Sequence, residues 1–80
     1  MPNSHMKLGT YQHSKNGKIY RVIGVALHSE SLEEMVIYES LYDNPKSKLW
    51  VRPKTMFLEQ IVLNGKSVPR FQFKGEKVYT

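Results

Sequence analysis

The chain has 80 residues, a mass of 9.3 kDa and no cysteine. This length allows one small core, and the lack of cysteine excludes disulfides, thiol catalysis, thiolate zinc sites and iron–sulfur clusters. Twelve lysines and arginines against seven acidic residues give a net charge of +5, which fits either a basic soluble surface or binding of an anionic partner.

The two ends of the chain lie outside the predicted domain. Residues 1–6 (MPNSHM) resemble a cloning junction, so we exclude them from the fold. The predicted domain covers residues 7–74, and residues 75–80 form a polar tail that we expect to be frayed. No apolar segment typical of a signal peptide or a membrane span is found, and the lack of cysteine suits a reducing compartment. We therefore expect a cytoplasmic protein without membrane contact.

The first half of the domain predicts strands. Residues 9–13 predict a short strand, and Asn16-Gly17 predicts the turn after it. Residues 18–28 predict a long, well-buried strand, because both of its faces are largely apolar and β-branched residues dominate. Gly24, in the middle of that strand, predicts a bulge or a sharp bend.

The middle of the domain continues this pattern. Residues 28–34 are polar and predict a loop, and residues 35–42 predict a strand. A helix competes with this strand because residues 32–41 contain helix formers, but Val36-Ile37-Tyr38 favours the strand. A turn over residues 43–48 then leads to a short strand at 49–52, which Pro53 stops.

The last third predicts a helical turn and a hairpin. Residues 54–60 (KTMFLEQ) predict one turn of α- or 3₁₀-helix, and Asn64-Gly65 predicts a tight hairpin whose second arm covers residues 66–73. Pro69 makes this arm an edge strand or a bulged one. Together the elements predict a mainly β protein, a small bent antiparallel SH3-like barrel with one short helical turn. An open sheet is the alternative.

One candidate site combines a histidine, a hydroxyl and a carboxylate in His28-Ser29-Glu30. Such residues form a catalytic triad when they converge from separate elements, which adjacent positions rarely achieve. The structural alternative is a strand end in which His28 caps the ladder and Ser29 bonds the turn backbone. We therefore assign no catalytic residue, and acid/base catalysis by His28 and Glu30 remains an alternative.

Sequence spacing supports no metal or cofactor site. Excluding His5, two histidines remain, His13 and His28, and their spacing matches no metal-binding motif. The glycines are isolated and form no phosphate-binding loop. We therefore expect neither a metal nor a cofactor.

A second candidate site combines aromatic and basic side chains. Trp50 and Arg52 share one face of the short strand, and an arginine beside an aromatic ring can stack on a base or bind a carboxylate or phosphate. Structurally, Arg52 could instead pair with Glu30 or Glu39, and Trp50 could belong to the core. The pattern adds Arg70 and several tyrosines to this set, Tyr11, Tyr20 and Tyr38.

The residues also resemble a known family over positions 9–73, the bacterial domain of unknown function 1653. The features that carry the resemblance are Gly-x-Tyr-x-His at 9–13, Tyr-x-Val at 20–22, His28-Ser29-Glu30, Val36 and Tyr38, Leu41-Tyr42, Trp-Val-Arg-Pro at 50–53, Met56-Phe57 and Pro-Arg-Phe at 69–71. Ser31 and Gln12 depart from the pattern. The resemblance implies no mechanism, but it implies one shared polar surface formed by His28, Ser29, Glu30, Trp50, Arg52 and Arg70.

These observations favour a non-enzymatic binding module for an anionic ligand, either nucleic acid, a nucleotide or an acidic peptide. The candidate ligand-binding residues are His28, Ser29, Glu30, Tyr38, Trp50, Arg52 and Arg70. A small enzyme is one alternative, and a protein-interaction or homodimerisation unit is another.

Overall fold

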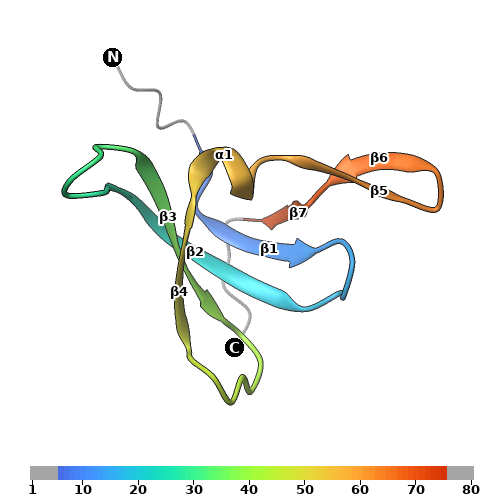
Figure 1. Cartoon of the computed structure of the whole chain (residues 1–80). Helices are drawn as coiled ribbons and strands as arrows, with labels where there is room; N and C mark the ends of the chain where they lie inside the picture. Colours follow the sequence, from blue (N-terminus) through green and yellow to red (C-terminus); the bar gives the residue numbers. More distant parts are fainter. Residues whose placement is uncertain (1–5, 76–80) are drawn as a thin grey trace.

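The computed structural model describes residues 6–75 and shows a mainly β protein (Figure 1). This confirms the predicted class, as does the short helix directly after Pro53. Residues 1–5 and 76–80, which hold most of the predicted cloning remnant and polar tail, lie outside the described residues. The elements in chain order are β1 (Gly9–His13), β2 (Ile19–Leu27), β3 (Glu34–Ser40), β4 (Leu49–Pro53), α1 (Lys54–Phe57), β5 (Gln60–Leu63), β6 (Lys66–Pro69) and β7 (Phe71–Gly75).

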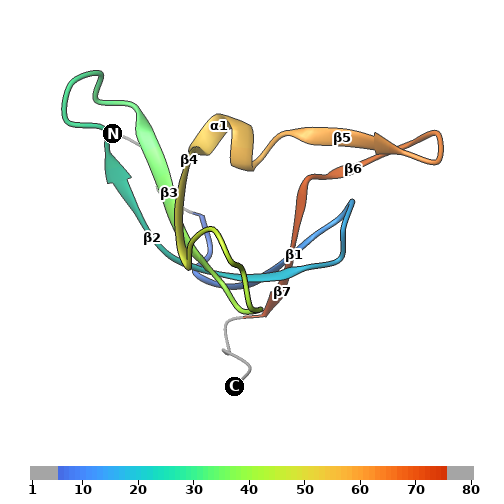
Figure 2. The same cartoon turned by 60° about the horizontal axis from the view of Figure 1, so that its bottom comes forward.

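The strands form two antiparallel sheets. One sheet has the order β4-β3-β2-β1-β7, and β5 and β6 form a separate two-stranded hairpin. Figure 2 shows the larger sheet curling beneath α1 and the hairpin. No strand pairing in residues 6–75 closes this sheet into a barrel, and the likeness to an SH3 barrel stays a prediction.

The long strand β2 bends where the sequence predicts it. Val22 pairs with Tyr38 and Gly24 pairs with Ile37, so Ile23 is an extra residue in the ladder. Such a bulge bends a strand and increases its twist. A Cβ on Gly24 would meet no atom within 4 Å. The bend therefore comes from the extra residue, and crowding does not require glycine at this position.

The hairpin after β5 is confirmed, but its second arm is shorter than predicted. Asn64 and Gly65 both have positive φ, 52° and 78°, as a tight turn of the type that suits twisted strands requires. The arm predicted over residues 66–73 instead divides at Arg70 into β6 and β7, which belong to different sheets. The backbone of Arg70 joins the two ladders, because its N–H donates to the Glu59 carbonyl at 3.0 Å, next to the β5–β6 pairs, while its carbonyl accepts from the Ser14 N–H at 2.9 Å, next to the β1–β7 pairs.

The core is largely aromatic and lies between the curved sheet and α1. Phe57 of α1 stacks on Phe71 with parallel rings whose centroids are 4.1 Å apart. Met6, the last residue of the predicted cloning remnant, packs against this core, and Gly75 ends β7 rather than starting a tail. We call the sheet face toward this core the inner face. The buried apolar side chains are Tyr11, Tyr20, Val22, Val36, Tyr38, Phe57 and Phe71.

No helix in the described residues is long and apolar enough to cross a membrane.

Candidate functional site

His28, Ser29 and Glu30 lie in the turn between β2 and β3, and all three are exposed. The Nδ1 atom of His28 accepts hydrogen bonds from the backbone N–H groups of Glu30 at 3.2 Å and Ser31 at 3.3 Å. The same turn is closed by a bond from the Leu32 N–H to the His28 carbonyl. These contacts give the His28 ring a structural role at the strand end, as the structural alternative to catalysis predicts.

Arg52 lies on the inner face, where its side chain contacts two aromatic residues of the core. Its Nε donates to the Tyr38 hydroxyl at 3.3 Å, and its guanidinium carbon is 5.7 Å from the centroid of the Phe71 ring. In the register of the sheet, Arg52 pairs with Val36 in the body of β3 rather than with the β2–β3 turn. The strand alternation therefore directs Arg52 over the core.

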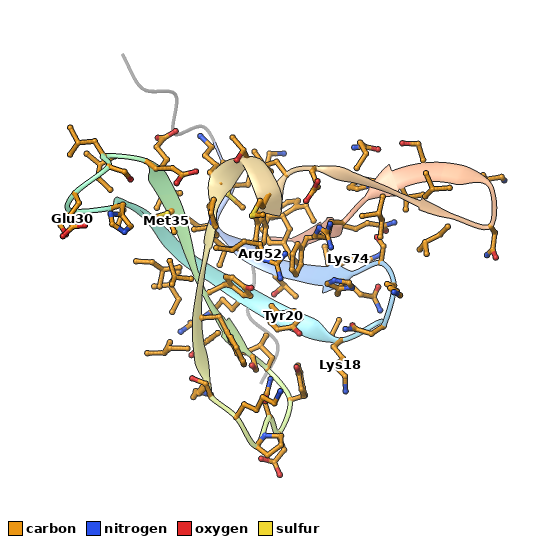
Figure 3. All side chains as sticks on the ribbon, viewed as in Figure 1. Lys18, Tyr20, Glu30, Met35, Arg52 and Lys74 are labelled. Carbon is orange, nitrogen blue, oxygen red and sulfur yellow. The ribbon has the colours of Figure 1, made fainter. Side chains whose placement is uncertain are left out.

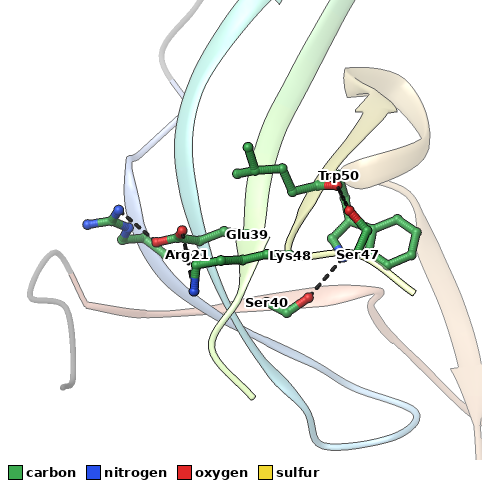
Figure 4. Close-up of polar contacts among 7 residues, drawn as sticks. Arg21, Glu39, Ser40, Ser47, Lys48 and Trp50 are labelled. Atoms are coloured by element: carbon green, nitrogen blue, oxygen red, sulfur yellow. Dashed lines mark hydrogen bonds and ion pairs between the residues drawn. The ribbon is translucent and has the colours of Figure 1, made fainter. Parts of the chain in front are cut away.

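The predicted ion pair between Arg52 and Glu30 is wrong, as is the pair with Glu39. Figure 3 shows Glu30 at the tip of the β2–β3 turn, away from Arg52. Glu39 lies on the outer face and pairs with Arg21 at 2.7 Å and with Lys48 at 3.9 Å (Figure 4). Among residues 6–75, no carboxylate forms an ion pair with Arg52.

Two further polar residues adjoin the Phe71 ring: Arg70, which precedes it in the chain, and His13, which contacts it. The Arg70 guanidinium binds Glu59 at 3.0 Å, and its buried Nε has no hydrogen-bond partner. The His13 ring meets the Phe71 ring edge to face at 4.9 Å. His13 was not among the predicted site residues, although the Gly-x-Tyr-x-His motif at 9–13 was a signal for it. We call His13, Tyr38, Arg52, Arg70 and Phe71 the Arg52 cluster.

Electrostatics at the cluster disfavour a further positive charge. Burial is the main reason that the pKa of His13 lies below its ordinary value of 6.5. The positive charges of Arg70, Arg52 and Lys15 lower this pKa further. His13 Nδ1 also accepts bonds from the backbone N–H groups of Lys15 and Asn16, at 3.2 and 3.4 Å. The cluster therefore has a positive field around a neutral imidazole.

This depressed pKa predicts a pH-dependent stability. Above the unfolded-state value near 6.5, His13 is neutral in both states. As the pH falls below 6.5, the unfolded chain binds a proton first, so the free energy of unfolding decreases down to the lower folded-state pKa. Urea denaturation at pH 7.5 and 5.5 measures this loss. His13→Asn, which keeps an acceptor near Nδ1, should lose less stability over the same interval, and an equal loss would contradict the assignment.

A group of tyrosines borders the cluster on β2 and the loop after β3. The hydroxyls of Tyr20 and Tyr42 are 3.0 Å apart, and Asn44 donates to Tyr42 at 2.8 Å. Burial and the hydrogen bond to Tyr42 raise the pKa of Tyr20, while Arg52 opposes this shift. The Lys18 ammonium lies 4.5 Å from the centroid of the Tyr42 ring. The sequence did not predict Tyr42, Asn44 and Lys18 as site residues, because the fold alone brings them close to Tyr20.

The structure thus brings together some of the predicted site residues and separates others. Tyr38, Trp50 and Arg52 share the inner face, since Trp50 pairs with Tyr38 across the ladder. Trp50 donates to Ser40 at 2.9 Å and packs against the core (Figure 4). The single polar surface implied by the family resemblance is not formed, because the β2–β3 turn lies apart from Arg52 (Figure 3). No group of three potential metal ligands occurs in the described part of the chain.

Comparison with known proteins gives a family and a fold relative. The family model described as "Protein of unknown function (DUF1653)" matches residues 9–73. A crystal structure of a DUF1653 protein from Bordetella bronchiseptica is similar, with a TM-score of 0.85 and 26% sequence identity over 95% of this chain and 96% of that chain. A search of curated proteins finds no match.

Proposed function

We propose that this chain, which belongs to the family of proteins of unknown function DUF1653, is a non-enzymatic binding module that binds an anionic ligand through Arg52. The observation that carries this proposal concerns the half-buried cations and whether each forms an ion pair with a carboxylate. Among residues 6–75 these are Arg21, Arg52, Lys54 and Arg70. All except Arg52 pair with a glutamate.

A half-buried guanidinium without a carboxylate is chemically suited to an external anion. Its free N–H groups can donate two parallel hydrogen bonds to a carboxylate or phosphate, and partial burial strengthens that interaction relative to bulk water. In Arg52 the Nε atom is engaged by Tyr38, which orients the group. The Phe71 ring supports it on another side. The orientation is therefore set before any ligand arrives.

The distribution of charge also favours anion binding on the side of the molecule that holds Arg52. Three glutamates, Glu30, Glu33 and Glu34, lie in or next to the β2–β3 turn, while the positive charges of Arg52, Arg70 and Lys15 all act on His13 in the cluster. An anion would thus be attracted to the Arg52 side and repelled from the β2–β3 turn. The rings of Tyr20, Tyr38 and Phe71 are between 5% and 8% exposed, so they offer little surface for base stacking. The site favours recognition of charge over recognition of bases.

The test compares two variants that remove the same charge. Arg52→Gln should weaken binding of a fluorescent glutamate-rich peptide and of a single-stranded oligonucleotide by about tenfold or more at low salt. Lys66→Gln, on the exposed hairpin, should change binding by about twofold at most, and raising the salt should weaken wild-type binding. Because Arg52→Gln strands no carboxylate, its cost in stability should be about 1 kcal/mol. Equal losses in both variants, or no binding of either probe, would overturn the proposal.

A further inference from the structure

Strand β4 is one edge of the five-stranded sheet, and the register shows which backbone groups face that edge. The Ser40 N–H donates to the Lys48 carbonyl at 2.8 Å, so these two residues form a hydrogen-bonded pair of the antiparallel ladder. Pairs alternate along such a ladder between hydrogen-bonded and non-hydrogen-bonded. Leu49, Val51 and Pro53 therefore direct their backbone groups away from β3, toward the free edge. Pro53 offers a carbonyl only.

The side chains of β4 form two different faces beside this edge. Leu49 and Val51 lie on the outer face, and each is 58% exposed. Trp50 and Arg52 lie on the inner face and are half-buried. An added strand alternates its own side chains in the same way. It would place one set of residues beside the apolar pair and the other set beside Arg52.

Charge decides which kind of strand fits. A second copy of β4 paired antiparallel about Val51 would set Arg52 of each copy opposite Trp50 of the other, and Trp50 offers the guanidinium no carboxylate. An acidic segment offers a carboxylate at this position, where Arg52 is the one half-buried cation in residues 6–75 that has no ion pair. The edge therefore favours an acidic partner over self-association.

We infer that β4 binds an extended acidic segment of another protein as an added antiparallel strand, with acidic side chains toward Arg52 and apolar side chains beside Leu49 and Val51. This inference rests on the proposed function and names its partner. Main-chain hydrogen bonds with the N–H and carbonyl of Val51 and with the Leu49 N–H supply affinity, since the Leu49 carbonyl already accepts from the Ser47 hydroxyl at 2.8 Å. The alternation of acidic and apolar residues supplies specificity.

The test uses short peptides of equal composition and charge. A peptide that alternates glutamate and valine should bind about tenfold more tightly than one with the glutamates and valines in separate blocks. In the bound register the valine N–H groups face β4, so N-methylation of the valines should abolish binding. N-methylation of the glutamates should leave it within about twofold. Equal effects of the two methylations would overturn the strand addition without involving the fold of the protein.

Protein variants provide the second arm of the test. Val51→Pro removes the edge-facing N–H and should abolish peptide binding, whereas Val51→Thr keeps the N–H and should retain it. Oligonucleotide binding through Arg52 should be unchanged in Val51→Pro. If peptide binding is also unchanged in this variant, the strand addition is overturned and the proposed function remains intact. Peptide binding that is insensitive to Arg52→Gln would overturn both. An oligonucleotide that binds more tightly than the alternating peptide of equal charge would overturn the acidic partner.

Discussion

Phe57→Ala is expected to lower the free energy of unfolding by about 3–5 kcal/mol, a typical cost of removing a buried phenylalanine. Phe57 is 1% exposed and stacks on Phe71 at 4.1 Å. It also meets the rings of Tyr11 and Tyr38 edge to face, at 5.4 and 5.3 Å. Since a chain of this size has little stability in reserve, we expect the variant to be largely unfolded near 37 °C.

Met56→Ala is the matched control for this substitution. Met56 precedes Phe57 in the same short helix, but its side chain is 50% exposed. Thermal unfolding followed by circular dichroism should therefore show a small change for Met56→Ala and a loss of the cooperative transition for Phe57→Ala. Similar small changes for both variants would mean that α1 does not complete the core.

The second large effect is expected at the outer-face ion pair of Arg21 with Glu39. Arg21→Met should cost about 2 kcal/mol, because it leaves the Glu39 carboxylate, whose side chain is 11% exposed, with Lys48 alone at 3.9 Å. The cost stays below that of a fully buried pair, because the Arg21 side chain is 38% exposed. The substitution also removes the buried Arg21 Nε, which has no hydrogen-bond partner.

A double substitution separates the stranded charge from lost packing. In Arg21→Met with Glu39→Gln no buried carboxylate remains unpaired, so urea denaturation should show a smaller loss than for Arg21→Met alone. If the double variant instead loses the sum of the two single effects, the two side chains do not interact energetically and the ion pair has no stabilising role.

The positions of the elements followed from local patterns. Residues 9–13, the helical turn after Pro53 and the Asn64-Gly65 hairpin lie where the sequence predicts them. Their signals are β-branched runs, proline stops and the backbone freedom of Asn-Gly, each of which acts within a few residues. The division of residues 66–73 was not predicted, because the exchange between sheets depends on contacts of Arg70 with distant backbone.

Alternation alone could not assign the faces of β2. Tyr20 and Val22 face the core before the bulge, but beyond it Val25 pairs with the buried Val36 and takes the inner position. The extra residue, Ile23, thus exchanges the odd and even positions of the strand. A glycine in the sequence indicates that a bulge is present without locating the inserted residue.

The sequence by itself determined the mainly β class, the short helix, the turns, the basic charge and the choice of Arg52, Arg70 and Tyr38 as candidate site residues. Only the tertiary structure decided which charges are paired. Strand register and the bulge of β2 place Glu39 on the outer face with Arg21, keep Glu30 in a distant turn, and direct Arg52 over Phe71. Ion pairing depends on which side chains meet across strands, and a shift of one residue exchanges the two faces.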